Sequence, residues 1–202
     1  INRALTGLGH EVKIFGVFND IFPLVNQLKM SPPDVVFNQF ESFDSNRELE
    51  PNIIALLELF NIPYTGASPE SMRLCKDKGL SKKLLSFDNI RVPKFFVSNK
   101  DKPLKNLPED MNYPCICKPL GLEGSEGISK ASLVANEKEC LERIAFVHRL
   151  SADAIIEEYI QGRELYVGVY GNDEVTVLPT QEMFFKKVPD GEPKFATYNA
   201  KW

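Results

Sequence analysis

The sequence predicts an α/β domain with a parallel sheet, followed by an α+β region. Residues 1–67 alternate helical and strand-like segments, a pattern typical of a parallel sheet flanked by helices. From Val92 onward, short apolar strands follow one another through turns, with a single long helical pattern between them. The second half is therefore expected to be antiparallel sheet with helices on one side, and we place the domain boundary near residue 67.

The N-terminal half opens with Ile1, Leu5 and Leu8 at helical spacing, and Gly9 is a typical helix terminator. Further helices are expected over residues 21–28 and from Pro51 to about Asn61. Strands are expected over residues 11–18 (EVKIFGVF), 34–38 (DVVFN) and 62–65. Because the chain opens inside a helix, we expect a strand to be missing before residue 1, and we expect the sequence to be truncated at both ends.

The next helix should begin at Ser68-Pro69-Glu70, where a capping residue precedes a proline and an acid. Gly79 is unfavourable inside a helix by about 1 kcal/mol relative to alanine. Asp77 is therefore expected to cap a second short helix and to place Lys78 at the break. The pattern alone favours a solvated surface position for Lys78, beside Lys82 and its neighbours.

The remaining strands alternate with one helix that starts at Asn136. Strands are expected over residues 94–97, 113–118, 128–132, 154–159, 165–170 and 175–178, with the turn Gly171-Asn172-Asp173 closing a hairpin. The helix should turn Leu141, Ile144, Ala145 and Val147 inward. Residues 184–202 are polar and are expected to form a loop.

Composition excludes several classes of protein. The 202 residues are 43% hydrophobic and 26% charged with a net charge of −4, which is ordinary for a globular chain. The absence of a basic run argues against a nucleic-acid partner, and the absence of a signal peptide or long apolar run argues against a membrane. Cys115 and Cys117 should point to the same face of a strand. With no second pair for a metal, the four cysteines are expected to be reduced thiols of a cytoplasmic protein.

The stretch YPCICKPLGLEGSEGISK brings a lysine to the mouth of a glycine-rich loop. Glycines let backbone N–H groups approach an anion, Ser125 can donate a hydrogen bond, and Lys118 supplies a positive charge. The spacing matches neither a Walker A loop nor the dinucleotide fingerprint. A phosphate site and an ordinary hairpin loop are both compatible with this stretch.

Two further groups of residues have both a functional and a purely structural interpretation. Glu157, Glu158 and Glu164 flank a strand end and the turn at Gly162, where carboxylates can accept from an adenine amino group or from ribose hydroxyls. They are equally compatible with solvated acids at a rim. The aromatic residues around Lys201, from Phe195 to Trp202, suggest either a lid or a tail that packs on its own domain.

Together these pieces resemble the ATP-grasp superfamily, and within it the D-alanine–D-alanine ligase group. The resemblance covers nearly the whole chain in order. Its blocks are PDVVFN, NIPYTGASPESMRLCKDKGLSKKLL, PCICKPLGLEGSEGISK, AIIEEYIQGRELYVGV and FATYNAKW. It implies an ATP-grasp fold that is incomplete in this chain. The implied divisions are an N-terminal α/β domain over 1–67, a central ATP-grasp subdomain over 68–157 and the start of a C-terminal subdomain over 158–202.

On the phosphate side, the resemblance implies that Lys78 contacts the nucleotide phosphates and that Lys118 lies over them and reaches toward the adenine. Gly124 and Ser125 would form a flexible loop over the γ-phosphate. Lys201 would be a further phosphate-binding lysine on a mobile loop that closes over the site.

On the base side, Glu157, Glu158 and the backbone of Ile160 would meet the adenine edge. Glu164 would accept from the ribose hydroxyls, and Phe195 would pack on the base. All ten assignments are carried over from the motif positions of the family.

The implied chemistry is ATP-dependent formation of an amide through an acyl phosphate, with ATP and Mg²⁺ as cofactors. The implied substrates are small and amino-acid-like, the implied context is peptidoglycan of the cell wall, and a homodimer through the N-terminal domain is possible. An ATP-grasp carboxylase, another peptide ligase and a non-catalytic ATP-binding module are the alternatives.

The chain departs from the family pattern in two places. Residues 39–50 (QFESFDSNRELE) contain neither the histidine nor the glycines that help those ligases hold their first amino acid. The family's metal ligands and its transition-state arginine would follow Trp202. We therefore expect no metal ligand and no catalytic residue within residues 1–202, and we expect this chain alone not to complete catalysis.

Overall fold

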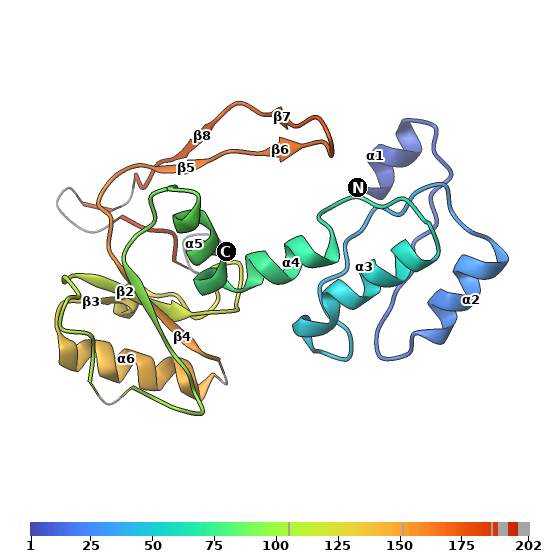
Figure 1. Cartoon of the computed structure of the whole chain (residues 1–202). Coiled ribbons are helices and arrows are strands. Elements are labelled where there is room, and N and C mark those ends of the chain that lie inside the picture. The colour runs from blue at the N-terminus through green and yellow to red at the C-terminus, as the bar shows by residue number, and fades with distance from the viewer. Residues whose placement is uncertain (105, 151, 187, 190–193, 198–202) are drawn as a thin grey trace. The chain divides into compact units, whose positions relative to one another are not determined.

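The computed structural model describes residues 1–104, 106–150, 152–186, 188–189 and 194–197. The chain divides into two compact units, Ile1–Cys75 and Lys76–Trp202, and the helix α4 (Pro69–Lys76) crosses the division (Figure 1). None of the helices in the described residues is long and apolar enough to cross a membrane.

The first unit is built on two helices that share an apolar core. Its elements are α1 (Asn2–Gly7), α2 (Phe22–Met30), the 3₁₀ turn η1 (Arg47–Leu49) and α3 (Glu50–Leu59). The core consists of Leu24, Leu28, Ile53, Leu57 and Ile62. The predicted helices of this half are therefore confirmed, and the apolar stripe that follows Pro51 supplies Ile53 and Leu57 to the core.

The predicted parallel sheet of the first unit is not confirmed. Within residues 1–75 the only parallel pairing is a single bridge between Val36 and Tyr64. The predicted strand over residues 11–18 is wrong: the segment forms no strand, and Ile14 and Phe18 are each 77% exposed. An apolar segment becomes a strand only where a neighbour pairs with its backbone in a ladder. Here the backbone contact with another segment is the Asp44 N–H, which donates to the Phe18 carbonyl at 2.8 Å, and no ladder forms.

The second unit contains a four-stranded antiparallel sheet in the order β1-β4-β2-β3. Its strands are β1 (Phe95–Ser98), β2 (Cys115–Pro119), β3 (Leu133–Val134) and β4 (Ala154–Glu158), and its helices are α5 (Lys78–Phe87) and α6 (Glu137–Arg149). In the register of β2 on β4, Ile116 lies opposite Glu157 and Lys118 opposite Ile155. This pairing brings a lysine and a glutamate to the same face of the sheet.

The helices α5 and α6 cover opposite faces of this sheet, so the expectation of helices on one side is wrong (Figure 1). The face toward α6 is a closed apolar core of Cys115, Cys117, Val134, Cys140, Ile144, Val147, Ala154 and Ile156. Cys115 and Cys117 share that face, as predicted. Burial raises the pKa of the Cys117 and Cys140 thiols to about 12, so both are protonated, inert core residues.

The helix α6 begins where the sequence indicates, because the Asn136 side chain accepts from the Glu139 N–H at 3.0 Å. The predicted inward face is partly wrong, since Ala145 is exposed and Arg143 is buried. The predicted strand over 128–132 is also displaced. Its last residues form the 3₁₀ turn η2 (Lys130–Ser132), and pairing with β2 starts only at Leu133. The Arg143 guanidinium donates to Ser132 Oγ at 2.9 Å, which holds this turn against α6.

Beyond β4 the chain forms two small two-stranded sheets. Their strands are β5 (Glu164–Tyr166) with β8 (Gln181–Met183), and β6 (Val169–Tyr170) with β7 (Thr176–Val177). The predicted hairpin is confirmed, and Gly171 in its turn has a positive φ of 119°. The predicted strand over 165–170 is interrupted between β5 and β6. Its first part pairs with β8 and its last part with β7, in two separate sheets.

The start of α5 confirms the predicted helix break. The Asp77 carboxylate accepts from the Leu80 N–H at 2.9 Å and caps the helix. Gly79 is buried against the sheet: a Cβ at this position would lie 3.1 Å from Val97 Cγ2 and 3.3 Å from Asp77 Oδ1. The glycine that disfavours a helix by propensity therefore lets α5 approach β1 closely.

We expect Gly79→Ala to destabilise the protein although alanine is the better helix former. The helix gains about 1 kcal/mol, but overpacking against a stiff valine and the capping carboxylate costs roughly 1–3 kcal/mol. Urea unfolding of the full-length protein measures the difference. Gly7→Ala in α1 is the matched control, since a Cβ there meets nothing within 4 Å. An equal gain in stability for both variants would contradict the close approach of α5.

Candidate nucleotide site

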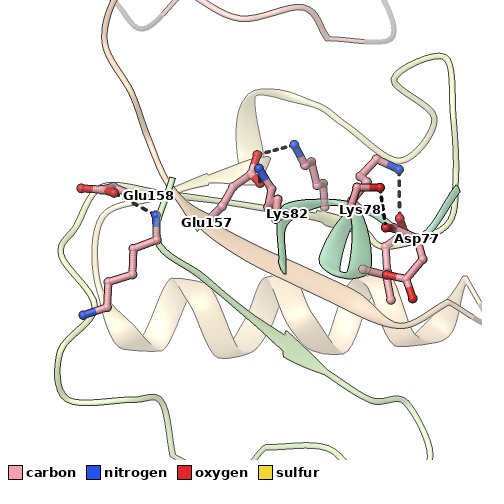
Figure 2. A network of polar contacts seen from close by, with 9 residues as sticks. Asp77, Lys78, Lys82, Glu157 and Glu158 are labelled. Carbon is pink, nitrogen blue, oxygen red and sulfur yellow. Dashed lines mark hydrogen bonds and ion pairs between the residues drawn. The ribbon is translucent and has the colours of Figure 1, made fainter. Parts of the chain in front are cut away.

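A cluster of charged side chains lies on the face of the sheet that α5 covers. At its centre the Glu157 side chain, on β4, is only 9% exposed. Lys118 from β2 donates to Glu157 Oε1, and Lys82 from α5 places its Nζ 3.1 Å from Oε2 (Figure 2). Two ammonium groups from different elements thus converge on one buried carboxylate.

The charge state of Glu157 follows from competition between burial and its two lysines. Burial alone would raise the pKa of this carboxyl, but the charges and hydrogen bonds of Lys118, and then of Lys82, bring the pKa below its usual value. Glu157 is therefore ionised at neutral pH. A single negative charge faces two positive ones, which leaves the cluster net positive.

Lys78 joins the glycine-rich loop to α5. Its ammonium group donates to the carbonyl oxygens of Leu120 at 2.9 Å and Leu122 at 2.5 Å. Burial lowers the pKa of Lys78, and the positive charge of Lys118 lowers it further, which indicates that the two lysines share one electrostatic environment. Lys78 therefore lies inside the cluster rather than on the solvated surface that its pattern favoured.

The loop after β2 has a backbone conformation that few residues tolerate. Gly124, Ser125 and Gly127 have φ values of 61°, 65° and 71°. A Cβ at Gly127 would lie 2.7 Å from Pro119 Cγ, so only glycine fits there. Ser125 is buried and its hydroxyl donates to the Ala196 carbonyl at 2.9 Å. The loop is therefore folded back on the strand and is tied to a segment far along the chain.

That segment, residues 194–196, is held at a second point by Tyr159, just after β4. The Tyr159 hydroxyl accepts from the Lys194 N–H at 3.0 Å. The Phe195 ring meets the Tyr159 ring edge-on, with centroids 6.4 Å apart and planes at 70°. Lys201 lies outside the described residues. Part of the expected closing segment thus lies against the glycine loop and the end of β4.

The acids at the end of β4 do not act together. Successive side chains of a strand point to opposite faces, and Glu158 accordingly turns away from Glu157 and accepts from the Lys94 N–H at 3.0 Å (Figure 2). Glu164, on β5, accepts from the Tyr166 hydroxyl at 2.8 Å, and Ile160 is 59% exposed. Of the predicted residues, the structure joins Lys78, Lys118 and Glu157, while Glu158 and Glu164 have partners elsewhere.

The sequence pattern does not single out Lys82. As one of several nearby lysines it is predicted to be solvated, but its side chain is only 16% exposed. The signal was its place four residues after Lys78, which puts both lysines on the same face of a helix. The orientation of that face toward a glutamate 75 positions later was not visible in the pattern.

The site suits a polyphosphate better than it suits a metal ion. Three lysines beside a glycine loop with left-handed backbone provide the positive charge and close backbone approach that phosphate requires. Among the described residues, no group of three or more His, Cys, Asp or Glu side chains is placed to hold a metal ion. These lysines and the loop therefore have the charge and the backbone geometry that a polyphosphate requires.

Comparisons with known proteins agree with this geometry. A family model described as "D-ala D-ala ligase C-terminus" matches residues 74–202. A D-alanine–D-alanine ligase from Thermotoga maritima is 31% identical over 210 residues, covering 100% of this chain and 61% of the relative. The chain spans about half the length of the curated relatives it matches.

Solved structures give the same result for the fold. A D-Ala:D-Ser ligase (VanG) from Enterococcus faecalis is 29% identical with a TM-score of 0.62, covering 74% of this chain and 43% of that one. A D-alanine–D-alanine ligase from Bacillus anthracis, complexed with ATP, is 22% identical with a TM-score of 0.60, covering 82% and 52%. The chain has the ATP-grasp fold, and it belongs to the D-alanine–D-alanine ligase family, whose C-terminal-domain model matches most of it.

Proposed function

We propose that the full-length protein is an ATP-dependent carboxylate–amine ligase and that this chain supplies much of its nucleotide site. One observation carries the proposal: Lys82 and Lys118 pair with a single buried carboxylate, and the ammonium group of Lys78 binds the glycine loop beside them. A net positive, partly desolvated cluster is the environment that a polyphosphate requires.

In this proposal Lys118 turns from Glu157 toward the phosphates, because a polyphosphate offers more negative charge than one carboxylate. Lys78 keeps the glycine loop against α5, and its positive charge adds to the attraction for the phosphates. The backbone around Gly124 and Ser125 closes over the γ-phosphate, and Lys201 approaches from the closing segment.

The base side is proposed from the family positions. The Glu157 carboxylate accepts from the adenine amino group, and the backbone N–H of Ile160 donates to the adenine edge. Phe195 packs on the base. Glu164 accepts from ribose after leaving Tyr166. Glu158 contributes to the base side only indirectly. Its side chain faces away from Glu157 and fixes the end of β4 by accepting from the Lys94 N–H.

When bound, ATP would supply the phosphoryl group that converts a carboxylate into an acyl phosphate. An amine would then attack the acyl carbon and displace inorganic phosphate to give an amide. The described residues bind and orient the nucleotide, and the two tied segments, the glycine loop and residues 194–196, exclude water from the site. Mg²⁺ would act as a partner of the phosphates and offset their charge.

The proposed product is a dipeptide of D-amino acids, as the names of the D-alanine–D-alanine ligase relatives suggest. The similarity to a D-Ala:D-Ser ligase supports a range of nucleophiles wider than D-alanine. Residues 39–50, which lack the histidine and glycines that help those ligases hold their first amino acid, are the segment that we expect to set the choice of the carboxylate substrate.

For the whole protein we retain the three proposed divisions at residues 1–67, 68–157 and 158–202. The single bridge between Val36 and Tyr64 is compatible with a parallel sheet in the first division. A homodimer through that division is also retained as a proposal.

Lys118→Ala in the full-length protein is expected to weaken ATP binding by about 1.5–3 kcal/mol, because charge-assisted contacts to phosphate are lost. Calorimetric titration with ATP measures the change. Lys94→Ala is the control, since its ammonium group pairs with Asp110 away from the cluster. Equal affinity of Lys118→Ala and the parent would mean that Lys118 only neutralises Glu157.

Release of ADP by the full-length protein should increase when D-alanine is added, with a D-alanyl dipeptide as product. The measurement is a screen of D-amino acids, L-amino acids and hydroxy acids by ADP release and mass spectrometry. Stimulation by other amino acids alone would reject the narrow D-alanine assignment. ATP binding without stimulation by any candidate would favour a non-catalytic module.

A further inference from the structure

The two cations on Glu157 are held differently. Lys118 is on β2, at the mouth of the glycine loop, and in the proposed function it turns to the phosphates. Lys82 is on α5, and its ammonium group also lies 6.0 Å from the centre of the Phe95 ring. The capped start of α5, the bonds of Lys78 and the close approach at Gly79 fix this helix against the sheet.

A nucleotide that draws Lys118 away would leave Glu157 with one cation in place of two. A buried carboxylate with no cation is strongly disfavoured in its charged form and takes up a proton instead. Protonation would turn one of its oxygens from an acceptor into a donor, which is the wrong partner for an amino group of the base.

We propose that Lys82 is a positioning residue that keeps Glu157 ionised while Lys118 is engaged on the nucleotide. This inference rests on the proposed ATP site. In this role Lys82 does not contact the nucleotide. It stays paired with Oε2 of Glu157, so Oε1 is free to exchange its hydrogen bond with Lys118 for one with the base.

The charged groups around Glu157 support a specific role for Lys82. On α5 these are Lys82 and the more distant Lys78, and on β2 the group is Lys118. The neighbouring residue of β1 on this face is the uncharged Phe95, and Glu123 of the loop acts on Lys78. Lys118 and Lys82 lower the pKa of Glu157 through charge and hydrogen bonds, whereas Lys78 interacts with Glu157 through charge alone, so loss of both pairs is expected to raise this pKa.

The test is the pH dependence of ATP affinity in Lys82→Met, measured in the full-length protein by titration calorimetry with ATP between about pH 5 and pH 8. In this variant, binding removes the last cation from Glu157, so the pKa of Glu157 rises and a proton is taken up. The ratio of the variant Kd to the parent Kd should therefore increase with pH, roughly tenfold for each unit by which that pKa rises. The ratio cancels the titration of ATP itself.

Four further variants separate this role from loss of structure. Lys82→Arg keeps the cation and should give a ratio that is independent of pH. Lys82→Gln should behave as Lys82→Met does, while Lys83→Met, at the exposed neighbouring lysine, should match the parent. Adding Glu157→Gln to Lys82→Met removes the titrating group and should abolish the pH dependence.

A ratio for Lys82→Met and Lys82→Gln that does not change with pH would overturn the inference, even if both variants bind ATP weakly. Failure of the unsubstituted protein to bind ATP would overturn the proposed function instead, and this inference with it. Proton uptake beyond that of the parent, read from calorimetry in buffers of different ionisation enthalpy, should appear with Lys82→Met, whereas Lys82→Arg should match the parent.

Discussion

A buried carboxylate between two ammonium groups is the interaction on which the second unit depends. Glu157 joins the central strand β4 to β2 through Lys118 and to α5 through Lys82, so one charge orders three elements. Removal of the carboxylate would leave two largely buried ammonium groups uncompensated, which is far more costly than the net gain from the pairs. The same arrangement that orders the sheet therefore also concentrates positive charge where an anion can bind.

Local signals in the sequence predicted much of the fold correctly. Helix starts at Asp77 and Asn136 were visible because a capping side chain acts on residues two or three positions away. The shared face of Cys115 and Cys117 followed from the period of a strand. The failures were non-local. The segment 11–18 is strand-like in composition but forms no ladder with a neighbouring segment. On α6, Arg143 is buried and Ala145 is exposed, the reverse of what the pattern indicated.

The site shows the same division between local and non-local information. The glycine loop and the lysine before it were evident from residue types, and the resemblance indicated Lys78 and Glu157. The place of Lys82 depends on how closely α5 approaches β1, which is set by Gly79, Val97 and the capping Asp77 together. No pattern within a single segment contains that distance, so a lysine in a run of lysines looked like solvated surface.

The attachment of residues 194–196 at two points has a consequence for the timing of a reaction cycle. The Ser125 hydroxyl holds Ala196 from one side and the Tyr159 hydroxyl holds Lys194 from the other. Withdrawal of this segment requires both bonds to break, and the Ser125 bond belongs to the loop that would cover the phosphates. The same opening barrier would then protect a reactive intermediate and delay release of the product. Stronger attachment of residues 194–196 would lower hydrolysis of the intermediate and would also slow turnover.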